Sequence, residues 1–249
     1  MSLPEIVSRQ EWLGRRKELL AREKELTRQI DGLNADRRRL PMVAVTKDYV
    51  FEGPAGAASL LDMFEGHRQL VLQHFMFDPS WDDGCSSCTA GVDELSDGLV
   101  AHLRARDTTY SLVSRAPLAK IEAYRNRKGW TIPWYSSHGS DFNYDFHVTI
   151  DESVAPVEFN YRGKDELAAA GLDWLGQPEN QPCEQPGVSF FLRDGDNVFH
   201  TYSTFARGTE MLGGAYSILD LTALGRQEEW EEPKGRAAAP RPAVPDFSP

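Results

Sequence analysis

Two cysteines separated by two residues, Cys85 and Cys88, are the side chains in this 249-residue chain with the most evident chemistry. The apolar run at residues 70–77 predicts a buried strand, which Pro79 ends, and residues 86–106 have helical spacing. A thiol at the start of a helix meets unpaired backbone N–H groups and the positive end of the helix dipole. The placement predicts a redox pair in which Cys85 is the nucleophile and Cys88, one turn further on, resolves it.

Two acidic residues, Asp82 and Asp83, directly precede this pair. A nearby negative charge disfavours a thiolate. The helix-end effect is worth about 0.3–1 kcal/mol when exposed, so two carboxylates could offset it. The sequence therefore predicts reaction at neutral pH without strong activation of Cys85.

The same two thiolates also allow a metal interpretation, because soft sulfur ligands joined by imidazole suit copper. Of the histidines in later segments, His147 and His200 complete the candidate set with Cys85 and Cys88, and His138 is a further candidate. The redox interpretation requires no cofactor, whereas this alternative requires copper. His74 falls inside the buried strand and is expected to be an ordinary core histidine.

The composition restricts the classes of partner. A net charge of −11 argues against nucleic acid and against anionic membrane surfaces. No apolar segment approaches the roughly 20 residues that span a bilayer, and residues 1–16 lack the apolar region of a secretory signal. Three cysteines do not form a disulfide framework, so a cytoplasmic location is expected.

One long helix is predicted over residues 5–38, with Ser8 and Glu11 as a capping box. Four apolar residues recur at seven-residue intervals: Trp12, Leu19, Leu26 and Leu33. Such a seam could lie across the domain or pair with its copy in a homodimer, although polar Arg16 and Glu23 at seam positions weaken a continuous coiled coil.

The rest of the chain predicts an α/β domain with a mostly parallel sheet. The expected elements are strands at 47–51, 68–77, 108–113 and 132–136, helices at 59–64, 86–106, 117–128 and 165–175, a hairpin at 188–201 and a closing helix at 216–224. The domain boundaries follow as an N-terminal amphipathic helix at 1–40, a main domain at 41–230 with an insertion at about 138–185, and a disordered tail at 231–249.

This order of elements resembles the thioredoxin-like superfamily, and the opening hairpin and short helix at residues 49–64 resemble its peroxiredoxin-like branch. Two motifs carry the likeness: Cys85-Ser86-Ser87-Cys88 at a strand-to-helix junction, and Pro186 just before a strand. The whole sequence also resembles a bacterial thioredoxin-like family of unknown function, through phrases such as FMFDPSWDDGCSSC and TYSTFARGTEMLGG, over residues 5 to about 230.

The resemblance implies a thioredoxin-like central sheet flanked by helices, and a thiol or disulfide substrate, either a protein or a small molecule. It also implies a cis-proline at Pro186, with Pro182 as the alternative, and substrate contacts from Pro186 and Trp81. The sequence departs from the families in its Ser-Ser dipeptide and in lacking the peroxidase pattern, since counting from Pro79 puts Ser86 at the cysteine position. A third hypothesis is a non-catalytic, dimerising thioredoxin-like module.

Three further features of the sequence each allow more than one interpretation. Cys183 is either a third redox partner or an ordinary loop thiol. Arg115, after a predicted strand, could hold an anion. Several aromatic residues between positions 130 and 146 could line a pocket for a small organic ligand, although aromatics at this density more often form core.

Overall fold

The computed structural model describes residues 4–214, 221–222, 228–230, 232 and 234. It divides into two compact units, Met1–Pro41 with Tyr216–Ala243, and Met42–Ala215 with Val244–Pro249. The predicted helix at 216–224 and the predicted disordered tail fall mainly on residues outside the described part. The domain boundaries stated above stay a prediction.

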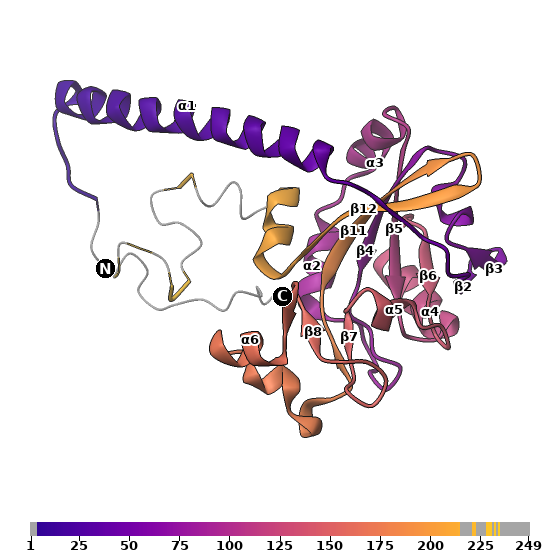
Figure 1. The fold of residues 1–249 in the computed structure, drawn as a ribbon. Coiled ribbons are helices and arrows are strands. Elements are labelled where there is room, and N and C mark those ends of the chain that lie inside the picture. Colours follow the sequence, from indigo (N-terminus) through magenta and orange to yellow (C-terminus); the bar gives the residue numbers. More distant parts are fainter. Residues whose placement is uncertain (1–3, 215–220, 223–227, 231, 233, 235–249) are drawn as a thin grey trace. The chain divides into compact units, whose positions relative to one another are not determined.

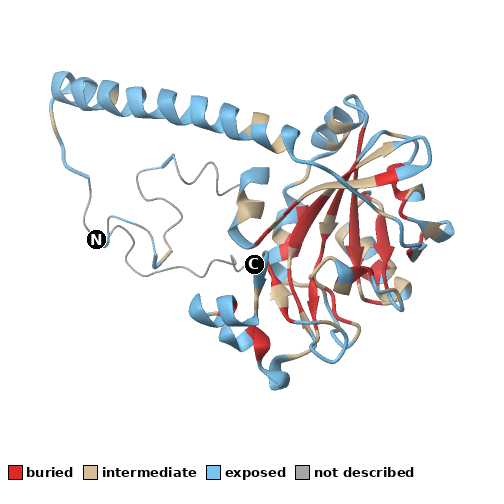
Figure 2. Ribbon diagram, viewed as in Figure 1, coloured by how far each residue is buried: buried red, intermediate tan, exposed pale blue. Residues whose placement is uncertain are grey.

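The N-terminal helix predicted from the sequence is α1 (Arg9–Arg39). Its start is fixed by Ser8, whose side-chain oxygen accepts a hydrogen bond of 3.2 Å from the N–H of Glu11. It ends at Leu40, directly before Pro41, because a residue preceding proline is disfavoured in helical conformation. None of its residues is buried, and Figure 2 shows it exposed along nearly its whole length.

An eight-stranded sheet, drawn in Figure 1, forms the centre of the second unit. Its strands are β1 (Val43–Ala44), β2 (Val50–Gly53), β3 (Gly56–Ser59), β4 (Gln69–His74), β5 (Thr108–Ser114), β6 (Trp134–Ser136), β11 (Gly187–Asp194) and β12 (Asn197–Phe205). They are arranged in the order β1-β12-β11-β4-β5-β6-β2-β3. The sheet is parallel only through β4, β5 and β6, and all other pairings are antiparallel.

Four of these strands form the core that the sequence predicts. β4 pairs in parallel with β5 on one side and antiparallel with β11 on the other, and β12 adds antiparallel to β11. Two parallel strands joined by helices, followed by a hairpin that pairs beside the first strand, is the thioredoxin-like arrangement. The fold class is therefore confirmed.

The helices lie on both faces of this core. On one face are α2 (Ser86–Asp93), α3 (Asp97–Arg104) and α4 (Leu118–Lys128), whose apolar residues join Val71, Phe75 and Leu112 in one core cluster. On the other face, the short 3-10 helix η1 (Asp62–Phe64) and α5 (Phe142–Asp145) pack against Leu70 and Leu72. Alternate side chains of β4 thus pack into the two cores on opposite faces of the sheet.

The prediction of a single helix over residues 86–106 is wrong, because α2 and α3 are separate helices. The side-chain oxygen of Ser96 accepts a 3.1 Å hydrogen bond from the N–H of Leu99, which caps a new helix at that point. The apolar spacing of Leu95, Val100 and Leu103 continues across the break, since both helices pack on the same core cluster.

The insertion between β6 and β11 has its own small core, which includes Val148, Ile150, Phe159 and Leu167. Its elements after α5 are β7 (Thr149–Ile150), β8 (Glu158–Phe159), β9 (Arg162–Gly163), α6 (Lys164–Ala169), the 3-10 helices η2 (Asp173–Gly176) and η3 (Pro178–Asn180), and β10 (Cys183–Glu184).

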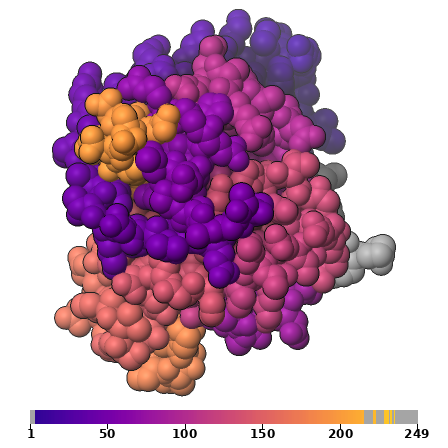
Figure 3. Space-filling model, turned by 90° about the vertical axis from the view of Figure 1, so that its right-hand side faces the viewer, coloured from indigo at the N-terminus to yellow at the C-terminus, as the bar shows by residue number. Residues whose placement is uncertain are grey.

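The hairpin predicted at 188–201 is confirmed as β11 and β12, which are longer than expected, and a last 3-10 helix, η4 (Ala206–Leu212), follows them. Edge strand β1, which has no counterpart in the sequence analysis, pairs with β12. In Figure 3, purple segments from the early part of the chain surround orange atoms of the hairpin.

Candidate functional site

Cys85 is the residue directly before α2, at the end of the loop that follows β4. Its N–H donates a 3.0 Å hydrogen bond to the carbonyl of Met76, which ties the end of the loop back to its beginning. Its own carbonyl accepts from the N–H of Thr89 at 2.9 Å and from the Thr89 hydroxyl at 2.8 Å. The backbone that carries the thiol is therefore fixed on both sides.

The residue before it, Gly84, is required by close packing. A Cβ at this position would lie 2.5 Å from Cε1 of Phe75, well inside contact distance. Phe75 is itself buried in the core cluster that includes Cys88. A glycine therefore lets the backbone of the loop pack directly against the Phe75 ring, one residue before Cys85.

The two thiols differ in exposure and in acidity. Cys85 is half-buried and Cys88 is buried, and both are free thiols. A hydrogen bond from the Cys88 side chain, helped by backbone N–H groups of Cys88 and Ser87, lowers the pKa of Cys85 to about 6. The same contact, together with burial, raises the pKa of Cys88. The geometry thus favours a thiolate at Cys85 held by a protonated Cys88.

The two acidic residues, which could offset this activation, are not among the groups that shift the pKa of Cys85. The carboxylate of Asp83 forms an ion pair with Arg127 of α4, and Asp82 and Asp83 are both exposed, so water screens their charge. The groups that set the pKa of Cys85 are instead the hydrogen-bond donors of α2 and Cys88.

The loop between β4 and Cys85 is held by a lysine that the sequence analysis did not single out. Lys120 of α4 donates to the carbonyls of Pro79, at 2.7 Å, and Trp81, at 2.8 Å. The Trp81 side chain is 39% exposed, so its ring lies on the surface of the loop that ends at Cys85. Its role as a substrate contact stays a prediction.

Arg115, expected as an anion holder, is occupied by two carboxylates of the protein. It follows β5, and its guanidinium pairs with Asp78 in the loop after β4 and, at 2.6 Å, with Glu184 on β10. All three side chains are largely buried, and Glu184 also accepts a 2.9 Å hydrogen bond from Thr149. The arginine links the cysteine loop to the insertion.

Pro186 precedes β11, whose first residue Gly187 is paired with His74 at the end of β4. The antiparallel register continues to place Pro186 opposite Phe75, at the same end of the sheet as the cysteines. The expectation of a cis bond before Pro186 is wrong, because among the described residues the cis peptide bond is Gln181-Pro182, the alternative position. Pro186 remains a predicted substrate contact.

The alternative copper set is not assembled. Cys85 and Cys88 belong to the core cluster under α2, whereas His147 and His200 line a pocket formed by β1, β12 and the insertion. Within the part of the chain that the structure describes, no three His, Cys, Asp or Glu side chains are grouped as metal ligands. The residues present therefore do not fit a copper centre.

The remaining candidates belong to other parts of the fold. Cys183 lies on β10 and packs against the core of the insertion, where its sulfur accepts a 3.1 Å hydrogen bond from Gln185. Burial raises its pKa, which makes it a poorer nucleophile than Cys85. His74 is a buried core histidine, as predicted, with a 2.8 Å hydrogen bond to Ser189. His138 is exposed, beside the carbonyl of Arg115.

The β4-β5-β11-β12 core, with Cys85 directly before α2 and Cys88 in its first turn, defines a thioredoxin-like protein. More specifically, the chain belongs to the DUF899 family, described as bacterial proteins of unknown function, which matches residues 1–240. No protein with a curated description matches the sequence. Among its described residues, no helix is long and apolar enough to cross a membrane.

Solved structures show distant similarity to the chain. A PrxQ mutant from Xylella fastidiosa has a TM-score of 0.40 at 12% identity, covering 66% of this chain and 84% of its own. A putative protein disulfide isomerase from Bacteroides thetaiotaomicron has a TM-score of 0.30 at 20% identity, with coverages of 41% and 64%. BsSco, a member of the Sco family of cytochrome c oxidase assembly proteins, has a TM-score of 0.30 at 15% identity, with coverages of 66% and 85%.

Proposed function

We propose that this protein is a thiol–disulfide redox protein in which Cys85 and Cys88 alternate between a dithiol and a disulfide. The observation that supports this best is the half-buried Cys85 directly before α2, with its pKa lowered to about 6 by the Cys88 thiol and backbone N–H groups. A thiolate at neutral pH is the nucleophilic form in disulfide exchange.

The reaction proceeds in two exchanges. The Cys85 thiolate attacks one sulfur of a substrate disulfide, which breaks the substrate S–S bond, forms a mixed disulfide and releases the first substrate thiolate. That thiolate takes the proton of Cys88, whose sulfur then attacks the sulfur of Cys85. The bond between Cys85 and the substrate breaks, and the second substrate sulfur leaves as a thiolate that takes its proton from water. Two electrons have then passed to the substrate, and an external thiol reductant must reduce the resulting Cys85–Cys88 disulfide.

The burial of Cys88 supports this division of roles. Its side chain is 6% exposed, so a substrate disulfide reaches Cys85 first. We propose that Trp81, in the loop that ends at Cys85, and Pro186, at the same end of the sheet, contact a protein or small-molecule disulfide. A reducing compartment such as the cytoplasm would supply the thiol that regenerates the pair.

A trapping experiment tests the proposal. In a Cys183→Ser background, the Cys88→Ser variant is mixed with a chromogenic aromatic disulfide, and released thiol and protein mass are measured. The proposal predicts release of half the thiol obtained with the intact pair, and a retained mixed disulfide at Cys85. A Cys85→Ser variant should form no such adduct. Equal reaction of the Cys85→Ser and Cys88→Ser variants would contradict the assigned roles.

A further inference from the structure

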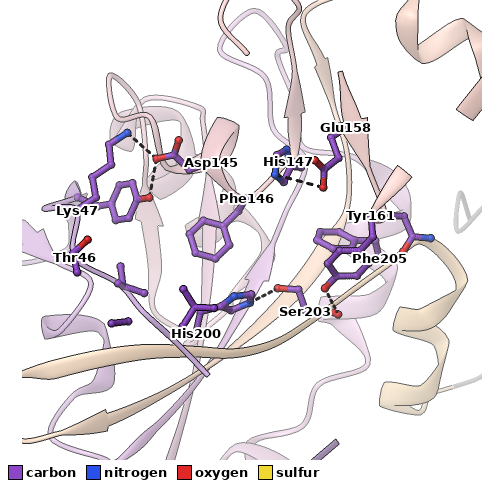
Figure 4. Close-up of a pocket in the computed structure, with 15 residues that line it drawn as sticks. Thr46, Lys47, Asp145, Phe146, His147, Glu158, Tyr161, His200, Ser203 and Phe205 are labelled. Atoms are coloured by element: carbon purple, nitrogen blue, oxygen red, sulfur yellow. Dashed lines mark hydrogen bonds and ion pairs between the residues drawn. The ribbon is translucent and has the colours of Figure 1, made fainter. Parts of the chain in front are cut away.

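A second candidate site lies on the opposite face of the sheet from the cysteine pair. It is a cavity of about 390 Å³ between β1, β12, the end of α5 and the β8–β9 turn. This volume falls within the range of about 300–1,000 Å³ that small-molecule sites occupy. Figure 4 shows its walls, which come from segments far apart in the sequence.

Aromatic rings form much of the wall. Tyr161 and Phe205 meet edge to face, with ring centroids 5.7 Å apart and planes at 72°. The Tyr161 hydroxyl donates a 3.0 Å hydrogen bond to the carbonyl of Ser203, which holds its ring beside the cavity. Phe146 packs against His200 at 5.3 Å and forms another part of the lining.

The ionised side chains of the cavity carry an excess of negative charge. Lys47 is the counter-ion of Asp145, at 2.7 Å, and of Asp141, at 2.8 Å, so its charge is already compensated. Glu158 lies 3.7 Å from Nε2 of His147, a distance at which the two form an ion pair only when the imidazole is protonated. Figure 4 shows Glu158 at the same end of the pocket as Tyr161 and Phe205, with Lys47 at the other end.

The floor is polar but carries no charge. A chain of side-chain hydrogen bonds runs through it. His200 and Ser203 are 2.7 Å apart, Ser203 and Ser189 are 2.7 Å apart, and the chain ends with Ser189 and His74 at 2.8 Å. Burial lowers the pKa of His200 and lowers that of His74 to about 3, so both rings are neutral at physiological pH. Among the described residues that line the cavity, the basic side chains besides His200 are Lys47, which is paired with two aspartates, and His147, which lies 3.7 Å from Glu158.

We propose that this cavity binds a small organic ammonium compound with an apolar or aromatic body. The ammonium group would lie between the Glu158 carboxylate and the faces of Tyr161 and Phe205, because aromatic faces and a carboxylate both attract a cation. The body of the ligand would occupy the apolar part of the cavity beside Phe146. An anionic ligand would be repelled by the Glu158 carboxylate.

The test compares three probes of similar size, binding to the full chain by calorimetry: phenylethylammonium, neutral phenylethanol and anionic phenylpropanoate. We expect the ammonium probe to bind about tenfold or more tightly than the neutral one, and the anion to bind most weakly. Equal binding of the ammonium and neutral probes, tighter binding of the anion, or no binding of the ammonium probe at millimolar concentration would each overturn the proposal.

Two variants locate the site. Glu158→Gln preserves the shape of the side chain and should abolish the preference for the ammonium probe. Glu152→Gln is the matched control, since Glu152 pairs with Lys164 at 2.7 Å outside the cavity and its loss should leave binding unchanged. Tyr161→Asn removes one aromatic face at a residue with φ +62°, a conformation that asparagine tolerates, and should weaken the ammonium probe selectively. Unchanged binding in Glu158→Gln would contradict the assignment.

Discussion

Cys85 and Cys88 share one hydrogen bond that shifts their acidities in opposite directions. Because the Cys88 thiol donates to the Cys85 sulfur, the pair concentrates negative charge on the sulfur that substrate can reach. The ordinary pKa of a cysteine is about 8.5, so at neutral pH an unperturbed thiol would be mostly protonated. The helix start and the second thiol together account for the difference.

This difference predicts the pH dependence of alkylation. In the reduced protein, the rate of Cys85 modification should rise with pH around a midpoint near 6, the value to which its pKa is lowered. Cys183, whose pKa is raised, should react only at higher pH. The rates are measured by mass spectrometry of each peptide after brief treatment with iodoacetamide. A Cys85 midpoint near the ordinary cysteine value would refute this assignment.

Gly84 offers a second test at the scale of one residue. Gly84→Ala adds a Cβ that must displace Phe75, so we expect a loss of about 1–3 kcal/mol in the free energy of unfolding. Gly91→Ala is the control, because the same atom there meets nothing within 4 Å inside α2 and should stabilise by about 0.5–1 kcal/mol. Urea denaturation measures both. Similar effects of the two substitutions would exclude the packing argument.

At the scale of elements, Arg115 connects three segments: the end of β5, the loop after β4 and strand β10. Its two carboxylate partners are buried, and each would lack its counter-ion without the guanidinium. Glu184 depends on it most, since burial raises the pKa of Glu184 while Arg115 lowers it. The position of the cysteine loop therefore depends on an ion pair made far away in the sequence.

Arg115→Leu should destabilise the protein by about 3–5 kcal/mol at neutral pH, because it leaves two buried carboxylates without a counter-ion. Without the Arg115 guanidinium, the pKa of Glu184 in the folded protein rises further. Its carboxyl group then takes up a proton more readily in the folded state than in the unfolded one. The loss should therefore shrink as the pH falls and Glu184 becomes neutral. Glu184→Gln should cost less and depend less on pH. The free energy of unfolding of both variants, measured at several pH values, tests this. An equal and pH-independent loss in Arg115→Leu and Glu184→Gln would contradict the role of the ion pair.

The α1 helix leaves its apolar seam exposed, with Trp12, Leu19, Leu26 and Leu33 between 46% and 55% exposed. Arg16 and Glu23, the polar residues at seam positions, form a 2.8 Å ion pair along the helix. This pairing lowers the desolvation penalty of burying the two side chains between paired helices. We propose that two copies of α1 pair through this seam.

Deleting residues 1–40, or replacing Leu19 and Leu26 with alanine, should then halve the mass in solution. Replacement of Lys17 and Lys24, which have the same seven-residue spacing, is the control and should not change it. Light scattering gives the mass directly. The same number of chains per particle in the full and the truncated protein would disprove pairing through α1.

For the whole molecule, the features that the sequence predicted were those with local signals. The apolar run before Pro79 predicted β4. The helix expected at 117–128 ends where Gly129 takes the left-handed conformation, and the strands of the expected hairpin meet just after Asp194. The cysteine pair at the start of a helix was predicted for the same reason. Each of these signals spans only a few residues.

The remaining features depend on contacts between residues far apart in the chain. Arg127 meets Asp83 across 44 positions and Arg115 meets Glu184 across 69, so neither pair has a spacing that sequence alone can recognise. The insertion forms strands of two residues, too short to show periodicity. The second cavity likewise joins β1, α5, β8 and β12, and its wall becomes evident only in three dimensions.

The central claim is that Cys85 and Cys88 form a reversible disulfide, and one measurement tests it most directly. The full chain is mildly oxidised, the remaining thiols are blocked, and the cysteine peptides are mapped by mass spectrometry before and after reduction. The account predicts a Cys85–Cys88 disulfide that a dithiol reductant removes completely, with Cys183 blocked throughout as a free thiol. Free Cys85 and Cys88 after oxidation, or a disulfide that joins Cys183 to either of them instead, would contradict it.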